Sequence, residues 1–90
     1  MKLKPNFVLR EVAGENIVIP IDAEAINFNG IMTLNDTGKF LWNQLKDGVS
    51  LDDLITNLCD QYEVERNIAA QDVTMFIEKL KNHHLLENGE

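Results

Sequence analysis

The sequence lacks the features that usually mark secreted and membrane-bound proteins. It has a single cysteine, Cys59, so no disulfide can form within the chain, and this fits a reducing cytoplasm. No run approaches the roughly 20 apolar residues of a membrane-spanning helix. Lys2 and Lys4 are followed by no apolar segment of the kind that a secretory signal contains. These absences predict a cytoplasmic protein without a membrane segment.

Basic residues are scarce as well. The chain has 8 lysines and arginines against 15 aspartates and glutamates, for a net charge of −7. Residues 35–90 hold most of this excess, with five basic and eleven acidic residues. Such a surface repels nucleic-acid phosphates and anionic lipid. It suits a basic peptide or a basic protein surface, although solubility alone would also explain it.

The sequence has few side chains that could bind a metal or act as a catalytic nucleophile, and their positions do not suit these roles. His83 and His84 are adjacent, so on a helix they point about 100° apart and cannot hold one metal ion together. Cys59 falls on an apolar helical stripe beside Asp60, whereas a nucleophilic thiol needs an electropositive neighbour. No glycine-rich phosphate loop is present. We therefore expect no metal site, no cofactor and no enzymatic activity.

The first third of the chain is rich in β-branched residues. Residues 7–12 and 17–21 are predicted to form two strands of a hairpin, joined by a turn that includes Gly14. Residues 31–34 follow the turn signal Asn29-Gly30 and are predicted to form a third strand. Residues 25–28 form either a separate short strand or the start of one bent strand over 25–34, and the pattern leaves both open.

From Asn35 onward the apolar residues recur at helical spacing. A first helix is expected between a cap at Asn35 or Asp36 and a left-handed end at Gly48. Ser50 caps a second helix, whose stripe has the spacing i, i+3, i+4, i+7, i+8, i+11: Leu51, Leu54, Ile55, Leu58, Cys59 and Tyr62. A third helix is expected from near Ile68, with Ala69, Val73, Phe76 and Leu80 on one face.

Three strands followed by three helices make an α+β fold in one domain over residues 1–90. Three helices and a sheet can also make a winged helix, so a winged-helix DNA-binding regulator is the alternative that needs testing. The helices argue against it, because a helix that enters the major groove exposes basic and amide side chains. The second helix instead exposes Asp52, Asp53 and Asp60, and the third contains Asp72 and Glu78. We therefore expect no nucleic-acid partner.

Several segments resemble one known family when they are taken in order. Residues 30–45 resemble the signature of PqqD-like proteins, a strand followed by L-N-x-T/V-G/A-x-x-I/L-W-x-x-L. Further similarity covers residues 46–54, the L-x-x-x-Y-x-V pattern that ends at Val64, residues 72–80 and the pair Leu85-Leu86. Together these matches cover about residues 7–87. His84 stands where the family often has glycine.

This resemblance implies a winged-helix-like domain with a three-stranded antiparallel sheet followed by three helices. Family members bind the leader segment of a ribosomally made precursor peptide and present it to a modifying enzyme, often a radical SAM maturase. The resemblance also implies that the leader is added as a strand to the third strand, in a groove closed by the third helix.

Strand addition is physically reasonable, because an exposed edge offers unpaired backbone groups to an extended peptide. The peptide-binding residues predicted on the strand are Ile31, Met32, Thr33 and Leu34, and those predicted on the third helix are Val73, Thr74, Ile77 and Lys81. The alternative is that these residues have no binding role and simply belong to the core or the solvent-exposed surface. The sequence identifies neither the peptide nor the enzyme, and it leaves the oligomeric state open, including a strand-swapped dimer.

Overall fold

The computed structural model describes residues 1–21 and 32–87. Its elements are β1 (Phe7–Val12), β2 (Glu15–Pro20), β3 (Met32–Leu34), α1 (Asp36–Lys46), α2 (Leu51–Tyr62) and α3 (Arg66–Asn82). The predicted α+β fold, with three strands followed by three helices, is confirmed. The possible strand at 25–28, and the question of whether it continues into 31–34, lie outside the described residues.

The sheet is antiparallel with the order β1-β2-β3. Val12 pairs with Glu15, so the hairpin loop consists of Ala13 and Gly14 alone, with φ angles of 53° and 84°. Two successive positive φ angles define the tight turn whose twist matches that of the flanking strands. Because this turn is shorter than the sequence predicts, β2 begins at Glu15 rather than at Ile17.

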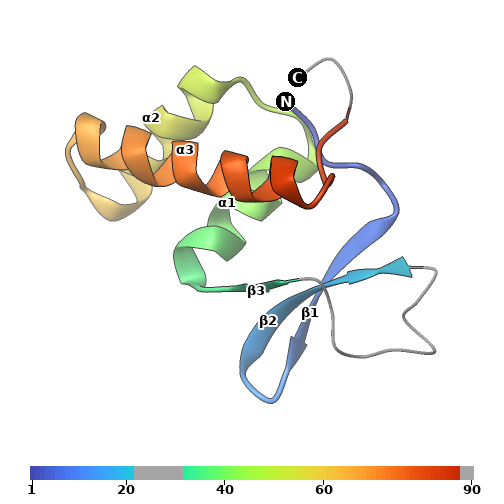
Figure 1. Ribbon diagram of the computed structural model, residues 1–90. Coiled ribbons are helices and arrows are strands. Elements are labelled where there is room, and N and C mark those ends of the chain that lie inside the picture. Colours follow the sequence, from blue (N-terminus) through green and yellow to red (C-terminus); the bar gives the residue numbers. More distant parts are fainter. Residues whose placement is uncertain (22–31, 88–90) are drawn as a thin grey trace.

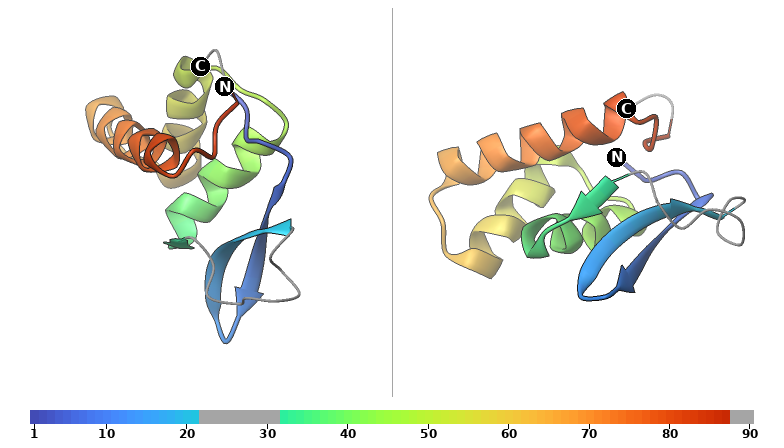
Figure 2. Two further views of the ribbon diagram at one scale, coloured as in Figure 1. Left: turned by 45° about the vertical axis from the view of Figure 1, so that its right-hand side comes forward. Right: turned by 60° about the horizontal axis from the view of Figure 1, so that its bottom comes forward.

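The helices lie together on one side of the molecule, and the hairpin of β1 and β2 extends away from them (Figure 1, Figure 2). The core forms where helices and sheet meet, and its most deeply buried large side chains include Val18, Leu41, Trp42, Leu45, Leu54, Leu58, Val73 and Leu80. Trp42 is only 2% exposed, so this large aromatic side chain belongs to the core.

Helix ends follow the predicted signals closely at α1 and α2. Asn35 Oδ1 accepts the Gly38 N–H at 2.8 Å, and Ser50 Oγ accepts the Asp53 N–H at 3.0 Å. These bonds satisfy donors that have no partner within a helix. Gly48, with φ 85°, follows α1 in the expected left-handed conformation.

The third helix begins at Arg66, two residues before the predicted start. Its first residues are exposed and polar, so the apolar pattern could not reveal them. Arg66 instead reaches across to α2, where its guanidinium donates to Asp52 Oδ1 at 2.6 Å and to Thr56 Oγ1 at 2.9 Å. This ion pair is exposed and contributes little to stability.

The chain after α3 turns back through a left-handed residue. His84 has φ 60°, its N–H donates to Lys81 O at 3.0 Å, and the Leu85 N–H donates to Leu80 O at 2.9 Å. This pair of bonds is the Schellman motif, in which glycine is the preferred left-handed residue. Leu85 and Leu86 are both buried, and Leu86 forms a β-bridge with Leu3.

Replacing His84 with glycine is expected to stabilise the protein by about 0.5–1 kcal/mol. Glycine adopts the left-handed conformation without the steric cost that other residues carry, although it has more freedom to lose on folding. Urea denaturation followed by circular dichroism measures the change. His83→Gly is the matched control, since His83 has φ −98° and gains nothing from glycine. An equal effect of the two substitutions would contradict this explanation.

Candidate functional site

The outer edge of β3 is the first element of the candidate site. Hydrogen-bonded and non-hydrogen-bonded pairs alternate along an antiparallel ladder. The Ile21 N–H donates to Asn6 O at 2.9 Å, so Ile17, four residues earlier, also directs its backbone groups toward β1. Thr33 lies opposite Ile17 and therefore directs its N–H and C=O away from β2. Within residues 1–21 and 32–87, no strand pairs with that edge.

A cavity of about 320 Å³ lies beside this edge. Its lining comes from three elements: Thr33, Leu34 and Asn35 at β3, Thr37, Gly38 and Leu41 on α1, and Asp72, Met75, Phe76 and Lys79 on α3. We call this cavity the β3–α3 groove. Gly38 permits its narrow base, because a Cβ there would lie 3.2 Å from the Leu34 Cβ.

The α3 wall of the β3–α3 groove combines apolar and charged groups. Phe76 is buried, whereas Met75 is 70% exposed and is a flexible, polarisable side chain that adapts to varied partners. Asp72 and Lys79 stand seven residues apart, which is about 10 Å along a helix. The wall therefore offers apolar contact in its middle and opposite charges toward its ends.

The predicted site residues are only partly brought together. Thr33 and Leu34 line the β3–α3 groove, while the side chain of Met32 is buried in the core. Ile31 lies outside the described residues. On α3, Val73 and Ile77 are 0% and 6% exposed, so their side chains are held in the core. Thr74 and Lys81 are exposed but do not line this groove.

The helical phase explains the difference on α3. At about 100° per residue, positions 72 and 79 fall on one flank of the buried stripe, and positions 74 and 81 fall on the other. Thr74 and Lys81, which the sequence analysis predicted as peptide-binding residues, therefore lie on the flank of α3 away from the β3–α3 groove, because the sequence pattern does not tell which side of α3 faces β3. One signal was present, since Met75 is a large apolar side chain that lies off the buried stripe.

Other kinds of site find little support in the part of the chain described. Residues 1–21 and 32–87 hold no group of three side chains able to bind a metal ion. No helix among them is long and apolar enough to cross a membrane. Cys59 is half-buried and packs against the core, and both histidines are exposed. Because α2 exposes three acidic residues and no basic one, the DNA-binding alternative is not favoured.

Comparison with protein-family models identifies a family. The family model described as "Coenzyme PQQ synthesis protein D (PqqD)" matches residues 15–86. A search of curated proteins found no match.

Two solved structures share the fold. One, described as TbiB1 in complex with the TbiA(beta) leader peptide, has a TM-score of 0.76 and 23% identity, over 100% of this chain and 99% of its own. The other, a lasso peptide synthetase B1 complexed with the leader peptide, has a TM-score of 0.70 and 26% identity, over 93% of each chain. Since the family model spans most of the chain, the protein belongs to the PqqD family.

Proposed function

We propose that this protein binds the leader segment of a ribosomally made precursor peptide as an added strand on β3, and presents it to a peptide-modifying enzyme. The observation that carries the proposal is the orientation of Thr33, whose N–H and C=O face away from β2 at the rim of the β3–α3 groove. An extended peptide would pair with these groups and gain affinity from its backbone. The two solved structures with the same fold were obtained with leader peptides, which supports this choice of ligand.

Specificity would come from the walls of the groove. The α3 side chains that we assign to leader contact are Asp72, Met75, Phe76 and Lys79, in place of the four predicted from the sequence. Met75 would pack against an apolar leader side chain, because such a side chain removes its exposed surface from water. Asp72 and Lys79 would select the charges that flank that contact.

The protein acts in this proposal as a recognition partner in the cytoplasm, without catalysis or a cofactor of its own. The enzyme that receives the leader is proposed to be a radical SAM maturase, the partner class that the family resemblance implies. Co-purification with the products of neighbouring genes tests this part. Recovery of a modifying enzyme of another class would correct the partner and leave the leader-binding proposal standing.

A titration monitored by nuclear magnetic resonance tests the binding site. A synthetic leader from a precursor gene beside this one, added to ¹⁵N-labelled protein, is expected to shift the backbone amides of residues 32–34 and 72–79 most strongly. The reason is that these residues border the groove that the leader would fill. Amides of α2, on residues 51–62, serve as the internal control. Shifts confined to α2, or no shifts at all, would contradict the proposed site.

A further inference from the structure

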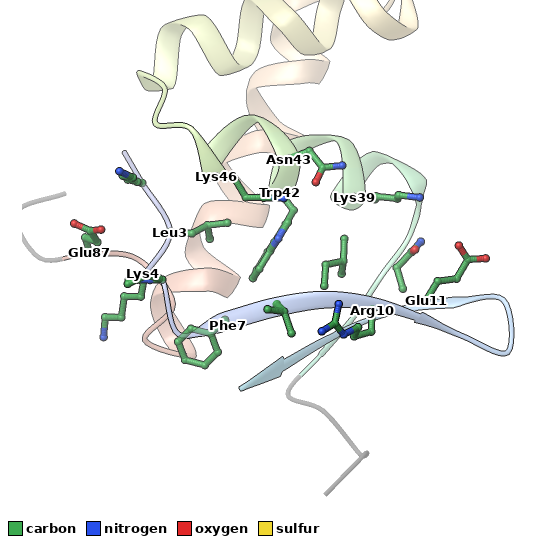
Figure 3. A pocket seen from close by; sticks show the side chains of 15 residues that line it. Leu3, Lys4, Phe7, Arg10, Glu11, Lys39, Trp42, Asn43, Lys46 and Glu87 are labelled. Atoms are coloured by element: carbon green, nitrogen blue, oxygen red, sulfur yellow. The ribbon is translucent and has the colours of Figure 1, made fainter. Parts of the chain in front are cut away.

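A second and larger cavity, of about 610 Å³, lies between α1 and the N-terminal part of the chain. Figure 3 shows its lining, with Lys39, Trp42, Asn43 and Lys46 on α1 facing Phe7 and Arg10 on β1. Its apolar lining consists mainly of the half-buried Phe7, Val8 and Leu9, together with the buried Leu3 and Trp42. We call it the basic cavity because most of the charged side chains that line it are basic.

The basic cavity concentrates positive charge on an acidic protein. Five of the chain's eight basic residues line it, namely Lys2, Lys4, Arg10, Lys39 and Lys46, against two acidic ones, Glu11 and Glu87. Its lining thus has a net charge of +3, while the remaining three basic and thirteen acidic residues of the chain give −10. Among residues 1–21 and 32–87, the four lysines of the cavity have no acidic partner.

The arrangement of the lysines suits an extended partner better than a small anion. Lys39 and Lys46 stand seven residues apart on α1, about 10 Å along the helix, and Lys2 and Lys4 lie on the N-terminal segment. Three of the four are exposed and Lys4 is half-buried, so the charges form a rim around an apolar floor. A phosphate site would instead gather its donors at one point.

The two cavities lie on different faces of α1. Thr37, Gly38 and Leu41 line the β3–α3 groove, whereas Lys39, Asn43 and Lys46 line the basic cavity. At about 100° per residue, positions 37 and 41 point nearly opposite to positions 39 and 46. A leader in the groove would therefore leave the basic cavity open to a second partner.

We propose that the basic cavity is the docking surface for an acidic segment, carrying apolar side chains, of the peptide-modifying enzyme. This inference rests on the proposed function, because it needs an enzyme to which the leader is presented. Opposite charges at the rim would steer the two proteins together, and the apolar floor would hold the docked segment. The leader and the enzyme would then occupy opposite sides of α1 at the same time.

Charge reversal tests the docking surface. Lys46→Glu is expected to weaken binding to the modifying enzyme encoded beside this chain by about tenfold, and Lys39→Glu/Lys46→Glu by more, because rim charges govern association. Lys81→Glu is the matched control: it makes the same charge change in the last turn of α3, lines neither cavity, and should leave the affinity within about twofold. Surface plasmon resonance with the unaltered chain as reference gives each affinity.

The leader titration separates this inference from the proposed function. Lys39→Glu/Lys46→Glu should bind the leader as the unaltered chain does, so loss of enzyme binding alone supports the docking surface. Equal effects of Lys46→Glu and Lys81→Glu, or no enzyme binding by the unaltered chain, would overturn it even if the leader binds. Saturable binding of pyrophosphate that displaces the enzyme would also overturn it, since the cavity would then be a small-anion site. Failure of the leader titration would instead count against the proposed function.

Discussion

Replacement of Thr33 by proline is expected to weaken leader binding by about tenfold or more while the protein stays folded. Proline has no N–H, and its ring would stand where an added strand must approach. A tenfold loss of affinity corresponds to about 1.4 kcal/mol of binding free energy. The lost hydrogen bond and the steric obstruction together should cost at least that much. The fold should survive because the Thr33 N–H points away from β2, so no ladder bond within the sheet depends on it. Fluorescence anisotropy with a labelled leader measures the affinity.

Thr33→Val is the control for this experiment. Valine keeps the backbone N–H and the β-branched shape that suits a strand, and it removes only the hydroxyl of an exposed side chain. Its leader affinity should match that of the unaltered chain, and circular dichroism should show that both variants are folded. If the folded proline variant binds the leader normally, then the leader is not added to the edge of β3.

Replacement of Trp42 by alanine is expected to lower the free energy of unfolding by about 3–5 kcal/mol. Trp42 is 2% exposed and packs in the core at the point where α1 meets the sheet. Its removal leaves a large cavity, and the total stability of a domain of this size is only about 5–15 kcal/mol. Urea denaturation followed by circular dichroism measures the loss, since the chain's one tryptophan is no longer available for fluorescence.

Asn43→Ala, at the next position along α1, is the matched control for Trp42. Asn43 is exposed, and its replacement removes no buried surface, so the free energy of unfolding should change by less than about 0.5 kcal/mol. A loss below about 1 kcal/mol for Trp42→Ala would mean that this side chain is not part of a closely packed core. Its burial would then have to be explained by something other than stability.

The helices were predictable because their sequence signals act locally. The α2 stripe repeats at helical spacing without interruption, and the caps at Asn35 and Ser50 are formed by hydrogen bonds to residues three positions later. Such signals depend on no distant part of the chain. The start of α3 at Arg66 was missed for the converse reason, because that turn is held by contacts of Arg66 with α2 rather than by its own apolar pattern.

The edge of β3 was likewise predictable from local sequence, whereas the α3 wall of the groove depends on tertiary packing. The strand at Thr33 could be located from its β-branched surroundings and from the family resemblance, whereas the wall depends on how α3 is rotated about its axis. That rotation is set by the packing of Val73 and Leu80 into a core shared with distant elements. The basic cavity was equally hidden, because its lysines lie at both ends of the first half of the chain and meet only in three dimensions.

The bridge between Leu3 and Leu86 also bears on how the two surfaces form during synthesis. The β3–α3 groove is complete once residues 33–79 have folded, but the basic cavity includes Lys2, Lys4 and Glu87. Lys4 N–H donates to Leu85 O at 2.9 Å, and Glu87 N–H donates to Lys2 O at 3.0 Å. These contacts span more than 80 residues, so they cannot form until residues 85–87 have left the ribosome. A nascent chain would thus acquire its leader groove before its enzyme-docking surface.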